Sequence, residues 1–191
     1  MLHFGQENKN DIQSADFSLA SKELFISPKF TTGDQHNDVC LIKTQESIST
    51  VAMNTCGMNK LCVSQACLPQ ASSMHGSECW VSGWSHSGKR VSSGVNVLSK
   101  QSCKNPTKLV KSHLTKDEIC VAIVDDNPLE PALCTAHAGG PLICNVDGKV
   151  TMSAIFSRTT SANCMASGNI GIFTDLYFAK NWIGLTIGEN K

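Results

Sequence analysis

One stretch of the chain is more informative than any other: Cys134-Thr135-Ala136-His137-Ala138-Gly139-Gly140-Pro141-Leu142-Ile143-Cys144. Two cysteines bracket a pair of glycines and a proline, and an apolar run follows the proline. A Gly-Gly step allows backbone angles that are barred to other residues, so it suits a tight loop that presents N–H groups. The stretch therefore predicts such a loop between the two cysteines.

The composition favours an all-β protein of one domain or two small packed lobes. The chain has 191 residues, of which 17% are charged and 6% are aromatic, and Lys plus Arg (16) equals Asp plus Glu (16). Because the formal net charge is zero, we expect neither nucleic acid nor a membrane as a partner. No apolar run approaches the length that spans a bilayer.

The ten cysteines indicate a disulfide framework made in an oxidising compartment. No set of Cys and His residues has zinc-ligand spacing, so we expect no metal and no cofactor. The first residues, however, are polar almost at once and contain no apolar signal-peptide core. This contrast suggests that a segment upstream of the chain is missing.

Many short strands are expected, with turns between them. They fall at residues 23–26, 39–43, 79–84, 95–99, 119–124, 142–146, 149–156 and 171–174. The pair Asp147-Gly148 is the strongest hairpin signal in the chain. Residues 1–22 and 44–72 are expected to be irregular.

The C-terminal end predicts a helix. Four apolar residues have helical spacing there: Leu176, Ala179, Ile183 and Ile187. Asp175 is placed to cap the start of the helix and Gly188 to end it.

Five stretches follow one another in an order typical of a known family: Phe25-Ile26-Ser27-Pro28-Lys29-Phe30, Asn37-Asp38-Val39-Cys40-Leu41-Ile42-Lys43, Cys67-Leu68-Pro69, Cys79-Trp80-Val81-Ser82-Gly83-Trp84 and the loop quoted above. They resemble the trypsin-like (chymotrypsin-fold, peptidase family S1) serine proteases, whose nucleophile loop reads Cys-x-Gly-Asp-Ser-Gly-Gly-Pro-Leu-x-Cys. The resemblance implies an all-β, chymotrypsin-like double β-barrel with a C-terminal α-helix.

The resemblance covers residues 1–188 as a partial trypsin-like domain. Residues 1–72 are expected to be the remnant of the N-terminal barrel, and residues 73–188 to form the C-terminal barrel and the terminal helix. The Ala-Ala-His-Cys motif and the Ile-Val-Gly-Gly start of the family do not occur, so we expect the first strands of the N-terminal barrel to be missing.

Three disulfides are implied by the resemblance: Cys79–Cys144, Cys103–Cys120 and Cys134–Cys164. Cys40 is expected to be a small buried hydrophobe inside a strand. The pairing of the remaining three cysteines stays open: Cys56, Cys62 and Cys67.

The resemblance places two catalytic positions, at Asp38 and Ala138. The family uses Ser as nucleophile, His as general base and Asp to orient the His. Asp38 matches the orienting Asp, although an aspartate before a strand can also simply cap a turn. Ala138 occupies the serine position, and a methyl group cannot attack a carbonyl. No motif supplies the base, and His3 is expected to be a bystander.

The oxyanion loop, implied to comprise Ala136, His137 and Ala138, is also altered. Ala136 replaces a glycine whose N–H helps to form the oxyanion hole. His137 replaces the Asp that pairs with the freed N-terminus of an activated protease. Both replacements indicate that the loop no longer supports catalysis.

The implied specificity pocket comprises Ala132, Ser157, Arg158 and Gly171. Ala132 sits where trypsins carry an acidic residue, and Ser157 and Arg158 replace the usual Trp-Gly at the pocket rim. Gly171 keeps the glycine of the back wall. Arg158 is expected either to enter the substrate cleft or to be a solvated surface residue.

These features predict a non-catalytic serine protease homologue, a pseudoenzyme that binds a protein partner such as a protease, an inhibitor or a substrate. Loss of the serine or histidine alone lowers turnover about 10⁶-fold, so we expect no peptidase activity. The family and the cysteines imply a secreted protein. The alternatives are a serine-type endopeptidase known only from a truncated sequence, and a non-functional fragment or isoform.

Overall fold

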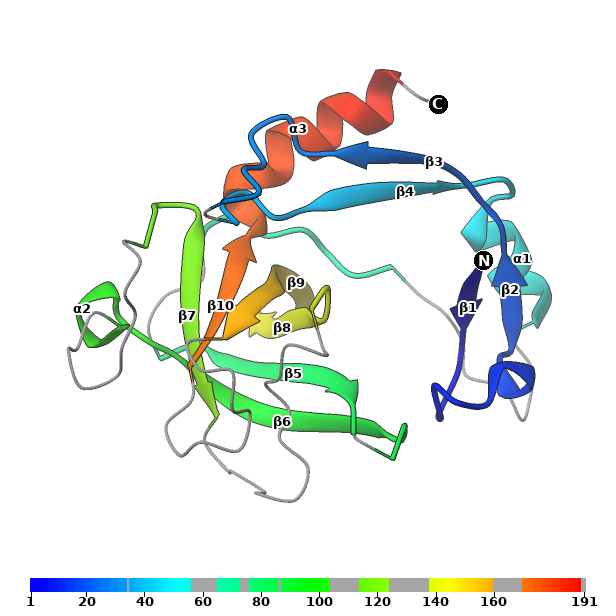
Figure 1. Ribbon diagram of the computed structural model, residues 1–191, viewed down its shortest axis with the longest axis horizontal. Coiled ribbons are helices and arrows are strands. Elements are labelled where there is room, and N and C mark those ends of the chain that lie inside the picture. The colour runs from blue at the N-terminus through cyan, green and yellow to red at the C-terminus, as the bar shows by residue number, and fades with distance from the viewer. Residues whose placement is uncertain are drawn as a thin grey trace.

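A closed antiparallel barrel forms the C-terminal half of the molecule (Figure 1). The computed structural model describes residues 1–33, 35–55, 65–72, 76–85, 87–103, 114–123, 138–159 and 170–189. The strands follow the order β10-β7-β6-β5-β8-β9 around the barrel. Their bounds are β5 (Glu78–Trp84), β6 (Arg90–Val97), β7 (Glu118–Ile123), β8 (Pro141–Val146), β9 (Lys149–Thr159) and β10 (Ile170–Asp175).

Apolar side chains from every strand of the barrel meet in its interior. On β5, Cys79 and Val81 are buried while Trp80 between them is 44% exposed, as the two-residue period of a strand requires. The rings of Phe156 and Phe173 lie 5.1 Å apart, centroid to centroid, in this core. The expected half-buried strand at residues 79–84 is therefore confirmed.

Two of the expected disulfides lie within the described residues, and both are present. Cys79–Cys144 joins β5 to β8, where the two residues face each other across the ladder. Cys103–Cys120 joins β7 to the short helix α2 (Lys100–Cys103). Each closed loop stabilises the fold by about 2–4 kcal/mol. The expected pair Cys134–Cys164 lies outside the described residues, as do Cys56 and Cys62.

The predicted turn at Asp147-Gly148 is confirmed. Both residues have positive φ, 52° and 75°, as a tight hairpin between β8 and β9 demands. The strand predicted at residues 95–99 begins earlier in the structure, at Arg90. The Ser/Gly-rich first part of β6 also pairs with β5, for example Ser93 with Val81. Small residues are tolerated there because cross-strand hydrogen bonds do not depend on side chains.

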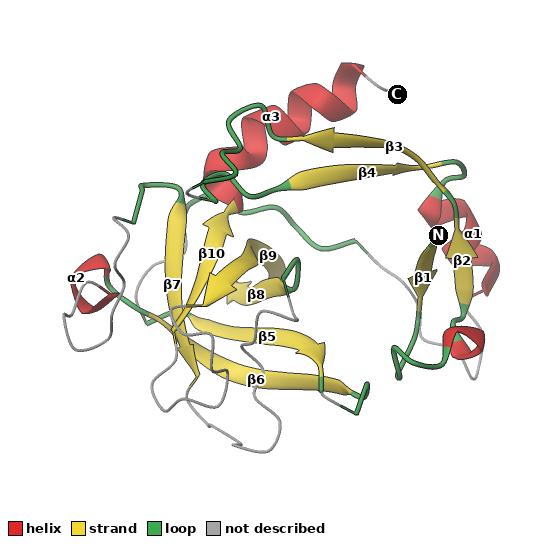
Figure 2. Cartoon of the chain, viewed as in Figure 1, coloured by secondary structure: helices red, strands yellow, loops and turns green. Residues whose placement is uncertain are grey.

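The N-terminal half contains two separate two-stranded sheets (Figure 2). The first pairs β1 (Leu2–Phe4) with β2 (Phe17–Leu19), with the 3₁₀ turn η1 (Ile12–Ser14) between them, and the second pairs β3 (Ser21–Ile26) with β4 (Cys40–Thr44). The expectation that residues 1–22 are irregular is therefore wrong. The rings of Phe4 and Phe17 stack at 4.7 Å across the first sheet and give it an apolar contact. The helix α1 (Ile48–Thr55) likewise corrects the irregular stretch expected over residues 44–72.

The burial expected for Cys40 is also wrong, because Cys40 is an exposed free cysteine. It lies opposite Ile26, and Leu24 lies opposite Ile42, so the four side chains share one face of the β3–β4 sheet. Leu24 and Ile26 are 62% and 65% exposed on that face. The opposite face is covered, since Leu41 packs against the C-terminal helix cluster.

The C-terminal helix α3 (Leu176–Glu189) lies along β3 and β4 (Figure 1). Leu176 and Ile183 are buried against Val39, as the predicted apolar stripe requires. Ile187 departs from the prediction and is 51% exposed, because the buried face of the helix continues from Ile183 to Thr186, which is 9% exposed. The mostly β architecture with a closed barrel and a C-terminal helix confirms the expected all-β, chymotrypsin-like fold class.

Asp175 caps the start of α3, as the sequence predicted. Its Oδ1 accepts the backbone N–H of Tyr177 at 2.9 Å, and its Oδ2 accepts the hydroxyl of Ser72. Asp175 is 1% exposed. Burial raises the pKa of this carboxyl above its ordinary value of 3.8, and the charge of Asp117 raises it further, against the two hydrogen bonds.

We expect Asp175→Asn to stabilise the protein above about pH 4. The raised pKa of Asp175 means that ionisation is less favourable in the folded chain than in the unfolded chain, so stability falls as pH rises through the folded pKa. Asparagine keeps the helix cap and removes this loss. Thermal melts from about pH 4 to about pH 7 measure the difference.

Asp175→Ala is the control for this experiment, because alanine removes the cap together with the charge. We expect it to be about 0.5–2 kcal/mol less stable than the asparagine variant at every pH. Identical pH profiles for the wild type and the asparagine variant would contradict a raised pKa at Asp175.

Candidate functional site

Asp38 lies in the loop between β3 and β4 and reaches the C-terminal barrel. Its Oδ2 accepts a hydrogen bond of 2.7 Å from the hydroxyl of Ser157, a buried residue of β9. The structure thus brings together two of the residues that the sequence had assigned to different parts of the site. Asp38 is more than a turn cap, because its partner is on the other half of the molecule.

Asp38 is the last of four consecutive loop residues that bond to this barrel. The carbonyl of Gln35 accepts from Nη1 of Arg158 at 3.5 Å, and the N–H of Asn37 donates to Oδ2 of Asp117 at 3.3 Å. Gln35 and Asn37 have φ values of 56° and 51°, in the left-handed region that side chains rarely adopt. These contacts hold the loop in a backbone conformation that is unfavourable by itself.

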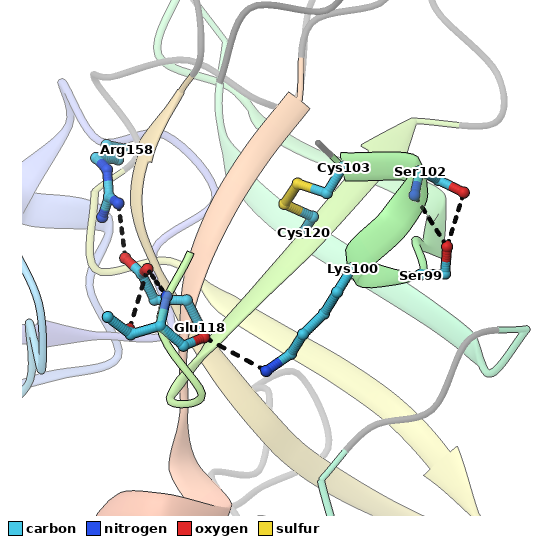
Figure 3. Close-up of a disulfide and its surroundings, with 8 residues drawn as sticks. Ser99, Lys100, Ser102, Cys103, Glu118, Cys120 and Arg158 are labelled. Carbon is cyan, nitrogen blue, oxygen red and sulfur yellow. Dashed lines mark hydrogen bonds and ion pairs between the residues drawn. A yellow bond between two sulfur atoms is a disulfide. The ribbon is translucent and has the colours of Figure 1, made fainter. Parts of the chain in front are cut away.

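The fourth contact is between His36 and a buried carboxylate, that of Glu118 at the start of β7. Figure 3 shows Glu118 with its other ion-pair partner, Arg158. Nη2 of Arg158 lies 2.6 Å from Oε1 of Glu118, and Nδ1 of His36 lies 3.3 Å from the same oxygen. The other oxygen, Oε2, accepts from the backbone N–H and the hydroxyl of Thr115. The side chain of Glu118 is only 2% exposed, and burying a carboxylate is costly unless such partners surround it.

The position of Arg158 contradicts one of the two interpretations that the sequence left open. Its side chain is 14% exposed and is directed at Glu118 (Figure 3), so it is not a solvated surface arginine. Its contact with the Gln35 carbonyl turns it toward the β3–β4 loop. Arg158 therefore joins the two halves of the molecule.

Neither histidine in the described part of the chain contacts Asp38. Nδ1 of His3 lies 2.7 Å from the hydroxyl of Ser18, within the β1–β2 sheet, as expected of a bystander. His36 is close to Asp38 in sequence, but its ring faces Glu118. An Asp–His pair able to activate a nucleophile is therefore absent from the described residues.

Ala138 is an exposed residue of the turn that precedes β8, three residues before the strand begins at Pro141. The next residue, Gly139, has a φ of +88°, and its N–H donates to the carbonyl of Phe156 at 2.8 Å. An open cavity of about 400 Å³ lies beside this turn. The methyl group of Ala138 lines this cavity and offers it no hydrogen-bonding or nucleophilic atom.

The remaining predicted site residues are distributed as follows. Gly171 is buried in β10, opposite Val121 of β7 and Thr159 of β9. Ala132, Ala136 and His137 lie outside the described residues.

Sequence reasoning missed Glu118 and His36. A glutamate at the start of an apolar run was the available signal for Glu118, because such a residue is rarely buried unless it is paired. Nothing local could indicate that its partner would come from β9.

The described residues contain no group of three or more His, Cys, Asp or Glu side chains that could hold a metal ion. Within the same part of the chain, no helix is both long and apolar enough to cross a membrane.

The family model and the relatives found by comparison with known proteins agree with one another. A family model described as "Trypsin" matches residues 3–183. The chain is 24% identical to cationic trypsin-3 of Rattus norvegicus over 99% of its own length and 71% of that protein. It is 25% identical to trypsin of Sus scrofa, over 99% of its length and 76% of that protein. Its identity to the urokinase-type plasminogen activator of Gallus gallus is 26%, over 92% of its length and 40% of that protein.

We expect Glu118→Gln to destabilise the protein by about 3–5 kcal/mol, because it removes one partner from a buried ion pair and leaves Arg158 uncompensated. Denaturant unfolding at neutral pH measures this loss. Glu23→Gln on β3 is the matched control, since Glu23 is exposed and we expect a change within about 0.5 kcal/mol. Equal stability of the two variants would show that the Glu118 contacts are not needed.

Proposed function

Because the chain belongs to the trypsin family and carries Ala138 at the nucleophile position, we propose that it is a non-catalytic serine protease homologue. It acts by binding a protein partner or a protease substrate. We also propose that residues 1–188 belong to one trypsin-like domain, with residues 1–72 in its N-terminal barrel and residues 73–188 forming the C-terminal barrel and helix. A secreted location fits the family and the two disulfides.

The surroundings of Asp38 carry the proposal. In a serine protease the orienting aspartate bonds to a histidine, and the histidine takes the proton of the serine. Here the bond of Asp38 is to Ser157, and neither described histidine reaches it. Asp38 therefore occupies the position of the family's orienting aspartate without its role in proton transfer. It still connects the two halves of the molecule through its bond to Ser157.

The expected size of the fall in turnover supports a binding function over a catalytic one. Removing the serine or the histidine of such a site lowers turnover by about 10⁶. The activity that then remains depends on an intact oxyanion hole and a bound substrate. Ala136 and His137 alter the loop that would provide that hole, so little of the residual activity is expected to survive.

We expect a fluorophosphonate probe to leave the folded chain unlabelled, because the family's serine is replaced by alanine and Asp38 has no histidine partner among the described residues. Intact-protein mass spectrometry after incubation measures the label, with a trypsin labelled in parallel as the positive control. Stoichiometric labelling that disappears on prior heat denaturation would overturn the proposal.

A further inference from the structure

The cavity beside Ala138 has the size of a ligand site. Its volume of about 400 Å³ falls within the range of about 300–1,000 Å³ that is usual for small-molecule pockets. The walls are residues 82–84 at the end of β5, Arg90 at the start of β6, and the turn formed by residues 138–141. All three walls belong to the C-terminal barrel or to the turn that enters it, so the cavity is carried by a rigid part of the fold.

Among the described residues that line the cavity, Arg90 is the one with a charged side chain. It is exposed, and no Asp or Glu of the described residues forms an ion pair with it. Its backbone is fixed, because its N–H donates to the carbonyl of Glu7 at 3.1 Å and it faces Trp84 across the ladder. Its guanidinium carries a planar fork of donors that matches a carboxylate.

The rest of the wall suits an apolar group. Trp84, Ala138 and Pro141 are the described lining residues with apolar side chains. A Cβ placed on Gly139 would meet no atom within 4 Å, so the space in front of the turn is open. Among the described residues that line the cavity there is no Asp or Glu, so Arg90 faces no lining carboxylate from this part of the chain.

We propose that this cavity binds a carboxylate attached to a compact apolar group. The carboxylate pairs with Arg90, and the apolar group lies against Trp84 and the turn at residues 138–141. The C-terminus of a peptide and a small organic acid both have this chemistry. The inference rests on the proposed function, since a methyl group at Ala138 allows such a ligand to be retained unchanged.

Isothermal titration of the full chain with three probes tests the proposal. The probes are the peptide acetyl-Ala-Ala-Phe with a free C-terminus, the same peptide as its C-terminal amide, and 3-phenylpropionate. We expect the free peptide to bind at least about tenfold more tightly than the amide, because a charge-assisted bond to Arg90 is lost. If the free peptide binds more tightly than 3-phenylpropionate, the ligand is a peptide C-terminus. If the two affinities are equal, the carboxylate and its aromatic ring are sufficient, and the ligand is a small organic acid.

Arg90→Gln should lower the affinity for the acid by a similar factor, and Arg90→Lys should restore part of it. Lys89→Gln is the matched control, because Lys89 is the adjacent exposed cation and does not line the cavity. Equal binding of acid and amide, unchanged binding by the Arg90→Gln variant, or no binding of any probe would overturn the proposal. Mass spectrometry of the recovered peptide tests the proposed function separately. A cleaved peptide would show that the chain is catalytic, whereas an intact peptide that does not bind would overturn only the carboxylate site.

Discussion

The contacts of residues 35–38 with the C-terminal barrel determine how the two halves of this molecule meet. At their centre is the carboxylate of Glu118, which is buried and lies within ion-pair distance of both Arg158 and His36. A buried carboxylate or guanidinium without its partner is strongly unfavourable, so each of these groups constrains where the other can lie. Arg158 also bonds to the Gln35 carbonyl, which extends the constraint to the backbone that carries Asp38.

This arrangement gives Asp38 a structural role that does not depend on proton transfer. Asp38 bonds to Ser157 on β9, so the residue contributes to the contact between the loop and the barrel whether or not a histidine is present. The barrel itself is held by an apolar interior and by the Cys79–Cys144 disulfide, neither of which involves the nucleophile position. Ala138 lies in an exposed turn beside an open cavity and is not part of the barrel core, so the fold tolerates alanine there.

Features with local signals could be predicted from the sequence, and features that depend on distant partners could not. The turn at Asp147-Gly148 and the cap at Asp175 follow from rules that act within a few residues. The exposure of Cys40 depends on which face of the β3–β4 sheet other elements cover. The alternation of side chains along β4 places Cys40 and Ile42 on one face, but it does not tell which face is covered. The ion pair of Glu118 with Arg158 joins strands on either side of β10, and no sequence period connects them.

We propose that the chain keeps a protease fold without a working catalytic mechanism, and that the missing nucleophile is only one part of this loss. Burst kinetics of the Ala138→Ser variant on an activated ester would show whether a serine alone restores the chemistry. We expect no burst, because neither histidine in the described part of the chain is bonded to Asp38. A burst equal in amount to the protein would show that the remaining groups can activate a serine at residue 138, and the proposal would then be wrong.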